Sequence, residues 1–172
     1  MAIFARVPES KYPLAPAGLH PAVCCDVIDR GLVDTQFGQK HQVEIRLQLE
    51  EAIESDKGLV RPVVRQRFTN SLHEKAKLRA VLETWRGAKF TKDELRGFDL
   101  ERLIGASCQV QVIHNVSDEG QTFANVNAVI PLGKGMPRVQ VGSDYVRELQ
   151  RTSMTPSNGD AADPLLEDEV PF

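Results

Sequence analysis

Apolar and polar side chains alternate along residues 42–49, which is the two-residue period of a β-strand. The apolar positions of this stretch are Val43, Ile45, Leu47 and Leu49, and the polar positions are Gln42, Glu44, Arg46 and Gln48. The pattern predicts a strand with one face in the core and the other face in water.

Four further segments have the composition of strands. Residues 19–33 are apolar and β-branched with polar interruptions, and they predict a long first strand that is bent or bulged at Gly31. Residues 59–70 follow a turn-like sequence and predict the hairpin partner of the strand at 42–49. The last two predicted strands are at 108–112 and 121–131.

Between the third and fourth predicted strands the hydrophobic period changes to that of a helix. Ser71 and Glu74 have the spacing of a capping box, and apolar residues then recur at helical spacing until Gly87, a typical helix end. A second capping box at 91–94 predicts a shorter helical piece that runs towards Leu103.

Three strands, a helical insertion and two strands are the plan of the OB-fold, a five-stranded Greek-key β-barrel with its helix between strands three and four. Trp85 lies on the apolar face of the predicted helix and is expected to plug the barrel. The predicted fold is therefore all-β, with an OB domain over residues 1–151 that begins with a proline-rich arm at 7–18. Small polar residues, proline and acids dominate residues 152–172, which predicts a disordered tail.

Acidic residues are concentrated at the C-terminal end. Five of the 24 Asp and Glu residues lie in residues 152–172, and no Lys or Arg does. The other 19 acids accompany 21 Lys and Arg residues in 1–151, so a mildly basic body of about +2 carries a tail of −5.

The sequence offers no sign of a membrane protein, a metalloprotein or an enzyme. No apolar run approaches the roughly 18 residues of a membrane span, and the N-terminus has no signal-peptide pattern, so we expect a cytoplasmic protein. The four histidines and three cysteines show neither CxxC pairs nor a His-x-x-x-His spacing. Because no Gly-rich phosphate loop is present either, we expect no metal, no cofactor and no catalytic activity.

The printed sequence ends on acidic residues followed by Val170, Pro171 and Phe172. The ring suits an apolar pocket, and the terminal carboxylate with Asp168 and Glu169 suits Arg or Lys on a partner. A solubilising acidic end is the simpler alternative, but it does not explain the final Val-Pro-Phe. We therefore predict that these five residues bind partner proteins. The ending resembles the acidic, proline-phenylalanine tip of bacterial single-stranded DNA-binding proteins.

The body resembles single-stranded DNA-binding proteins of phages, through segments such as 31–41 and 71–75 and again at 124–132. The resemblance implies a protein that coats single-stranded DNA without strong sequence preference during replication, recombination and repair, in a bacterial cell or a phage-infected host. The tail is then expected to recruit replication or recombination proteins, and its acids to compete with DNA for the basic body.

OB proteins bind nucleic acid on the outer face of strands two and three and on the adjoining loops. On this plan the predicted DNA contacts are Phe37, Lys40, Arg46, Arg61, Arg65, Arg67, Phe68 and Phe123. The cations would neutralise phosphates, and stacking of a base on an aromatic ring contributes roughly 1 to 3 kcal/mol.

Simpler interpretations of the same residues stay open. Arg65 and Arg67 are also compatible with a solvated strand face, and Phe68 and Phe123 with core positions. The alternative is that the chain is an OB-fold interaction or adaptor module, which binds proteins but no nucleic acid. Whether it forms homo-oligomers is left open.

Overall fold

The computed structural model describes residues 14–55 and 58–152. Most of its regular structure is strand, and the helices are short. In chain order the elements are β1 (Gly18–Thr35), β2 (Gly38–Leu49), β3 (Ile53–Ser55), β4 (Gly58–Val60), β5 (Val63–Thr69), α1 (Lys77–Arg86), α2 (Lys92–Arg96), the 3₁₀ helix η1 (Leu100–Leu103), β6 (Ser107–Val116), β7 (Thr122–Ile130) and α3 (Glu148–Thr152).

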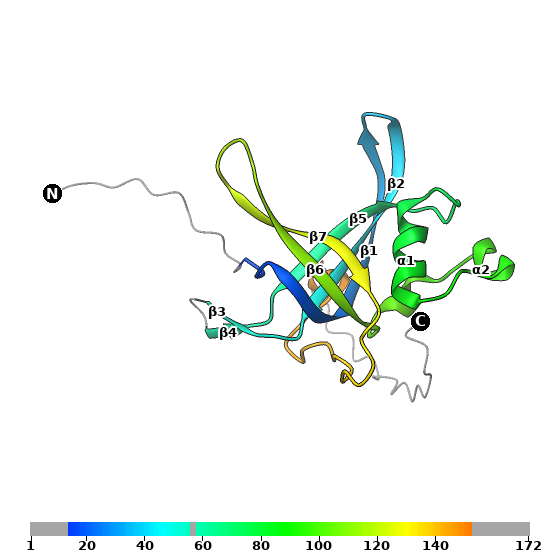
Figure 1. Cartoon of the computed structure of the whole chain (residues 1–172). Helices are drawn as coiled ribbons and strands as arrows, with labels where there is room; N and C mark the ends of the chain where they lie inside the picture. Colours follow the sequence, from blue (N-terminus) through cyan, green and yellow to red (C-terminus); the bar gives the residue numbers. More distant parts are fainter. Residues whose placement is uncertain (1–13, 56–57, 153–172) are drawn as a thin grey trace.

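The five long strands form one antiparallel sheet in the order β5-β2-β1-β6-β7 (Figure 1). This confirms a mostly β fold built on five strands. The sheet is not closed, however, because no ladder joins the edge strands β5 and β7 within the described residues. Helix α1 packs against both edge strands, and the closed barrel predicted from the sequence is not formed by the described residues.

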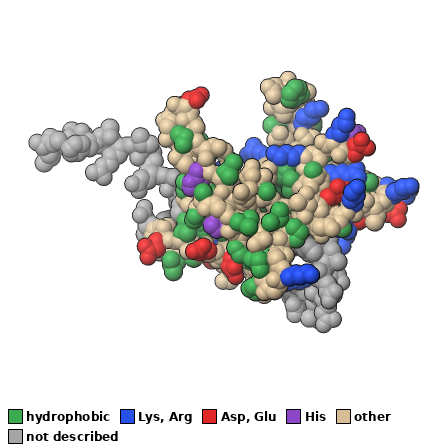
Figure 2. Space-filling view, viewed as in Figure 1, with side chains coloured by type: hydrophobic (Ala, Val, Ile, Leu, Met, Phe, Trp, Pro, Cys, Tyr) green, Lys and Arg blue, Asp and Glu red, His purple; other side chains and the backbone are tan. Residues whose placement is uncertain are grey.

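Two hairpins extend beyond the body of the sheet. The distal parts of β1 and β2 form one, and β6 and β7 form the other (Figure 1). The space-filling view shows both as projections with a notch between them (Figure 2). Residues at the ends of these hairpins therefore stand away from the core.

Strand β1 is long and irregular, as its sequence predicts. Its register with β2 shifts between Cys24 and Asp26 and again between Asp29 and Gly31, so that Cys25 and Arg30 are bulged residues. Gly31 has a φ of 69°, a left-handed conformation that glycine adopts without steric cost. A bulge redirects side chains, and here it accompanies the position of Arg30 on the outer face of the sheet.

The single strand predicted at 59–70 is interrupted. Its first residues pair in the small β3–β4 hairpin, and the strand of the main sheet begins only at Val63. Pro62 lies at the interruption and lacks the N–H that a continuous ladder needs, although its carbonyl accepts a hydrogen bond from the Leu49 N–H.

The first predicted capping box does not form. The Ser71 hydroxyl accepts a hydrogen bond from the His73 N–H, a local turn that competes with helix capping, and helix α1 starts at Lys77 without a side-chain cap. Its predicted end is confirmed, because Gly87 has a φ of 74° and its N–H donates to the Glu83 carbonyl.

The second capping box forms as predicted. The Glu94 N–H donates to the Thr91 hydroxyl, and the Thr91 N–H donates to the Glu94 carboxylate. The helix that it begins has only five residues, and the chain reaches Leu103 through the separate 3₁₀ helix η1.

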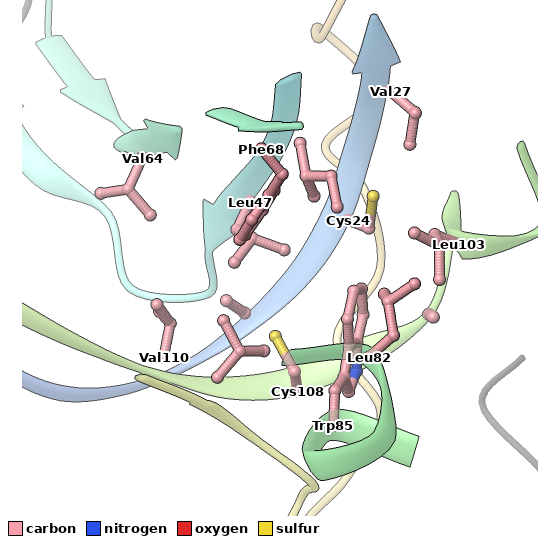
Figure 3. Close-up of a cluster of buried hydrophobic side chains, with 14 of the residues drawn as sticks. Cys24, Val27, Leu47, Val64, Phe68, Leu82, Trp85, Leu103, Cys108 and Val110 are labelled. Atoms are coloured by element: carbon pink, nitrogen blue, oxygen red, sulfur yellow. The ribbon is translucent and has the colours of Figure 1, made fainter. Parts of the chain in front are cut away.

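The core lies between the inner face of the sheet and the apolar face of α1. Figure 3 shows Leu82 and Trp85 of this helix beside side chains of the strands. Trp85 is buried, as expected, and its indole N–H donates to the Ser107 carbonyl at 2.9 Å. Among the helices in the described part of the chain, none has the length and apolar character needed to cross a membrane.

Replacing Leu82 with alanine should lower the free energy of unfolding by about 2 to 5 kcal/mol, because the side chain is fully buried and its removal leaves a cavity. Leu32 is the matched control, since it is exposed on the β1–β2 hairpin and its replacement should change stability by no more than about 0.5 kcal/mol. Urea unfolding measures both. Equal losses of stability for the two variants would show that α1 does not contribute the core described here.

Candidate nucleic-acid interface

The outer face of β2 is the first place where the structure differs from the sequence pattern. Its polar residues were expected in water, but Glu44 is 0% exposed, Arg46 9% and Gln48 4%. Buried charged residues require partners. Glu44 is paired with arginines of the sheet itself. Arg46 and Gln48 also have partners in residues 138–150, the segment that leads into helix α3, which we call the C-terminal strap.

The strap is attached to the sheet by backbone hydrogen bonds at three points. The Gly142 N–H donates to the Gln48 side-chain oxygen at 2.7 Å, and the Val139 N–H donates to the Ser107 hydroxyl at 2.9 Å. Arg61 donates to the Gln140 carbonyl at 2.8 Å and also to the Leu49 carbonyl on β2. A polypeptide without a strand of its own therefore covers part of the outer face.

Asp26 is a buried carboxylate beneath the strap. It accepts hydrogen bonds from the Arg147 guanidinium at 3.0 Å, the Glu148 N–H at 2.8 Å and the Tyr145 hydroxyl at 3.3 Å. Nothing in the local sequence marks Asp26 as buried, because its three donors lie about 120 residues further along the chain.

Glu44 is the second buried carboxylate of the outer face. Three guanidinium groups donate to it, from Arg30 at 2.8 Å, Arg46 at 2.8 Å and Arg67 at 3.0 Å. Burial by itself would raise the pKa of the Glu44 carboxyl, but the hydrogen bonds from Arg30, Arg67 and Arg46 outweigh it and lower this pKa from 4.5 to about 2.

Glu148, at the start of α3, connects the strap to two of the same arginines. Its carboxylate accepts from Arg46 at 3.1 Å and from both terminal nitrogens of Arg30, at 3.0 and 3.3 Å. The outer face of β1 and β2 and the strap over it thus hold a charge network, in which Glu44 and Glu148 both pair with Arg30 and Arg46, and Asp26 pairs with Arg147.

Two of the predicted DNA contacts do not face solvent. Phe68 is 4% exposed and packs in the core, so the prediction that it stacks a base is wrong. Arg46 was predicted to meet phosphate on a wet strand face, but the strap covers it and its guanidinium is paired with Glu44 and Glu148. Arg61 is half-buried and binds backbone carbonyls.

Arg65 and Arg67 do lie on an open surface. Both side chains are exposed on the outer face of the edge strand β5, where Arg65 is opposite Arg46 and Arg67 is opposite Glu44 in the register. Arg67 donates to Glu44 with about half of its side chain still exposed. Arg65 makes no ion pair with any residue in the described ranges.

The remaining predicted contacts lie on the two projecting hairpins. Phe37 is 78% exposed in the turn between β1 and β2, and Lys40 is exposed close by on β2. Phe123 is 44% exposed near the start of β7, on the other hairpin, and is not a core residue. Figure 2 shows Lys and Arg side chains in the notch between the hairpins. Acidic side chains, Asp118 and Glu119, occupy the turn of the β6–β7 hairpin.

The predicted partner-binding residues, Asp168 to Phe172, lie outside the described residues. The three cysteines are buried and form no disulfide, and burial raises the pKa of the Cys108 thiol to about 12. In residues 14–55 and 58–152, no cluster of His, Cys, Asp and Glu has an arrangement that could hold a metal ion.

A scan of the chain against models of known protein families finds no match, and a search of curated proteins finds none either. The residues of this surface are therefore the basis on which a function can be assigned.

Sequence reasoning missed the members of the charge network. Glu44 and Arg46 alternate with apolar residues just as solvent-facing residues do, and nothing local distinguishes the two cases. The one available signal was the expected bulge at Gly31, because bulges often occur where a side chain is redirected to a functional or structural site.

The network makes stability depend on pH in an acidic range. The pKa of Glu44 is about 2 in the folded protein and 4.5 as its ordinary value, so its contribution is complete above pH 4.5 and is lost as the pH falls towards 2. Glu44→Gln should therefore be less stable than the unchanged protein by about 3 to 5 kcal/mol at pH 7.

Below pH 4.5 the difference in the free energy of unfolding should shrink, because protonated glutamate resembles glutamine. Urea unfolding at several pH values measures it, with Glu54→Gln on the exposed β3–β4 hairpin as the control. A difference that stays constant from pH 7 to pH 3 would contradict the lowered pKa.

Proposed function

We propose that this protein binds single-stranded DNA without strong sequence preference, through the open part of its outer sheet face and its two projecting hairpins. The proposal includes no catalytic step. It places the protein in replication, recombination or repair, in the cytoplasm of a bacterial cell or a phage-infected host.

One observation carries the proposal. Two hairpins that stand away from the core each expose an aromatic ring, Phe37 on one and Phe123 on the other, with Lys and Arg side chains in the notch between them (Figure 2). Exposed aromatic rings are costly in water, and a basic surface beside them is the combination that binds flexible, unpaired nucleotides.

The chemistry follows from the side chains. Arg65 and Arg67 lie two residues apart on one strand face, so their guanidiniums are spaced for successive contacts with a phosphate backbone. Phe37 and Phe123 offer rings to bases, and stacking tolerates any base because every base has a π-face. Duplex DNA hides those faces, so the site favours single strands.

The strand order supports an OB-type assignment as part of the proposal. An OB barrel is partly open, and its helix lies between the third and fourth strands of the barrel. The sheet order β5-β2-β1-β6-β7, with α1 between β5 and β6, follows that plan. The loops that OB proteins use for oligonucleotides correspond to the turns of the two hairpins.

The terminal residues support the second half of the proposal. We propose that Asp168, Glu169, Val170, Pro171 and Phe172 recruit replication or recombination proteins, as the resemblance of this ending to bacterial single-stranded DNA-binding proteins suggests. The five acids of residues 152–172 also compete with DNA for the basic surface, since a tethered segment can reach a millimolar effective concentration.

Replacing Arg65 and Arg67 together with alanine should weaken binding to labelled oligo-dT. The log–log dependence of affinity on salt should become flatter by about 0.7 for each phosphate that the variant no longer neutralises. Lys92→Ala with Arg96→Ala is the matched control, because it removes the same charge from exposed positions on α2. Fluorescence anisotropy between low and moderate salt measures both.

An equal effect of the two double variants would mean that only net charge matters and that DNA binds at a surface other than the one formed by Arg65 and Arg67. If the unchanged protein fails to bind oligo-dT at low salt, the DNA-binding proposal falls and a module that binds only proteins becomes the better interpretation.

Removing every residue after Arg151 should tighten oligo-dT binding at low salt, because the tail carries five acids and no cation to compete with the phosphates. The effect should fade as salt rises, since screening weakens the tail's attraction to the body. A matched control keeps the tail and replaces its five acids with Asn and Gln. Unchanged affinity in both variants at low salt would exclude competition by the tail.

A further inference from the structure

The three carboxylates on the outer sheet face differ in how firmly they are held. Glu44 and Asp26 are fully buried and each accepts hydrogen bonds from three donors. The Glu148 side chain lies at the rim of the network, is 31% exposed, and accepts from Arg30 and Arg46. Of the three, Glu148 is the carboxylate that can leave without exposing the others.

Glu148 binds the two arginines in the manner of an anionic ligand. One of its oxygens accepts from Arg46 and from Arg30, and the other accepts from the second terminal nitrogen of Arg30. This two-oxygen arrangement on a guanidinium is also the arrangement of arginine with phosphate, so a phosphodiester could occupy the same position.

The surroundings of Glu148 favour an anion from outside the chain. Arg46 and Arg65 lie directly opposite each other on β2 and β5, and like charges at such positions repel unless an anion lies near them. The Nε of Arg30 is buried and has no hydrogen-bond partner among the described residues. Without Glu148, Glu44 would be the one carboxylate left in ion pairs with Arg30, Arg46 and Arg67 among the described residues.

We infer that Arg30 and Arg46 form a phosphate-binding site that Glu148 occupies in the free protein, and that the backbone of bound single-stranded DNA displaces this carboxylate. The inference rests on the proposed function and adds a contact and a means of regulation to it. The opened site joins the surface of Arg65 and Arg67, which extends the phosphate path from the edge strand towards the middle of the sheet.

Displacement does not require the strap to leave the sheet. Val139 and Gly142 hold its first half to Ser107 and Gln48 through backbone hydrogen bonds. The Glu148 N–H and the Arg147 side chain hold Asp26 independently of the Glu148 carboxylate. A rotation of one partly exposed side chain is therefore sufficient, and the anion that replaces it restores the lost hydrogen bonds.

Glu148→Gln tests the inference, because it removes the negative charge and keeps the size of the side chain. Binding of oligo-dT should tighten by at least about fivefold, the lower end of typical coupling between two competing ligands. The log–log salt dependence should also steepen by about 0.7, the value for one additional phosphate contact. Asp144→Asn is the control, because it makes the same charge change at an exposed position of the same strap.

The same change made in a second protein variant distinguishes a specific phosphate site from an effect of net charge alone. In a protein that already carries Arg30→Gln, Glu148→Gln should tighten oligo-dT binding less than it does in the unchanged protein, and it should not steepen the salt dependence of that binding. Thermal unfolding of each variant checks that the fold is retained. If Glu148→Gln does not fold, Glu148→Asp replaces it, since the shorter carboxylate keeps the charge but loses its reach to both guanidiniums.

The outcomes separate this inference from the proposed function. If the unchanged protein binds oligo-dT and Glu148→Gln behaves like Asp144→Asn, the phosphate site is overturned and the proposed function stands. If neither the unchanged protein nor Glu148→Gln binds, both fall. A steeper salt dependence for Glu148→Gln alone, cancelled by Arg30→Gln, supports the inference.

Discussion

A buried carboxylate surrounded by three guanidinium groups is the interaction on which the outer half of this protein depends. Moving a charge such as that of Glu44 out of water costs several kcal/mol, and the cost is offset only when good hydrogen bonds replace the lost hydration. Arg30, Arg46 and Arg67 supply them from three adjacent strands. Glu44 therefore fixes the positions of these arginines, and through them the place where the strap can bind.

The strap divides the outer face into two parts with different properties. Beneath it, on β1 and β2, the charges are paired and largely excluded from water. Beyond it, on β5, Arg65 and Arg67 remain exposed at the edge of an open sheet. The sheet can stay open there because α1 covers its inner side at β5 and β7, so the apolar core is protected without a closing ladder.

Local sequence signals predicted the features that local physics controls. The alternation in β2 placed Val43, Ile45 and Leu47 in the core correctly, and the Thr91–Glu94 box and the stop at Gly87 formed as expected. The first capping box failed because Ser71 formed a competing turn with His73. The exposed positions of Arg65, Phe37 and Phe123 were compatible with the pattern, whereas the buried positions of Arg46 and Phe68 at the candidate site were decided by packing.

The sequence by itself determined the order of the five long strands and the place of helix α1 between the third and fourth of them, the apolar face of β2, the basic balance of residues 1–151 and the acidic character of residues 152–172. These depend on periodicity and composition, which are read within a few residues. Only the tertiary structure decided that Glu44, Arg46 and Asp26 are buried. The partners of Glu44 come from three different strands, and Arg46 and Asp26 have partners, Glu148 and Arg147, that lie more than 100 residues away in the chain. Alternation reports that two faces differ, but which face meets water depends on the segments that pack against it.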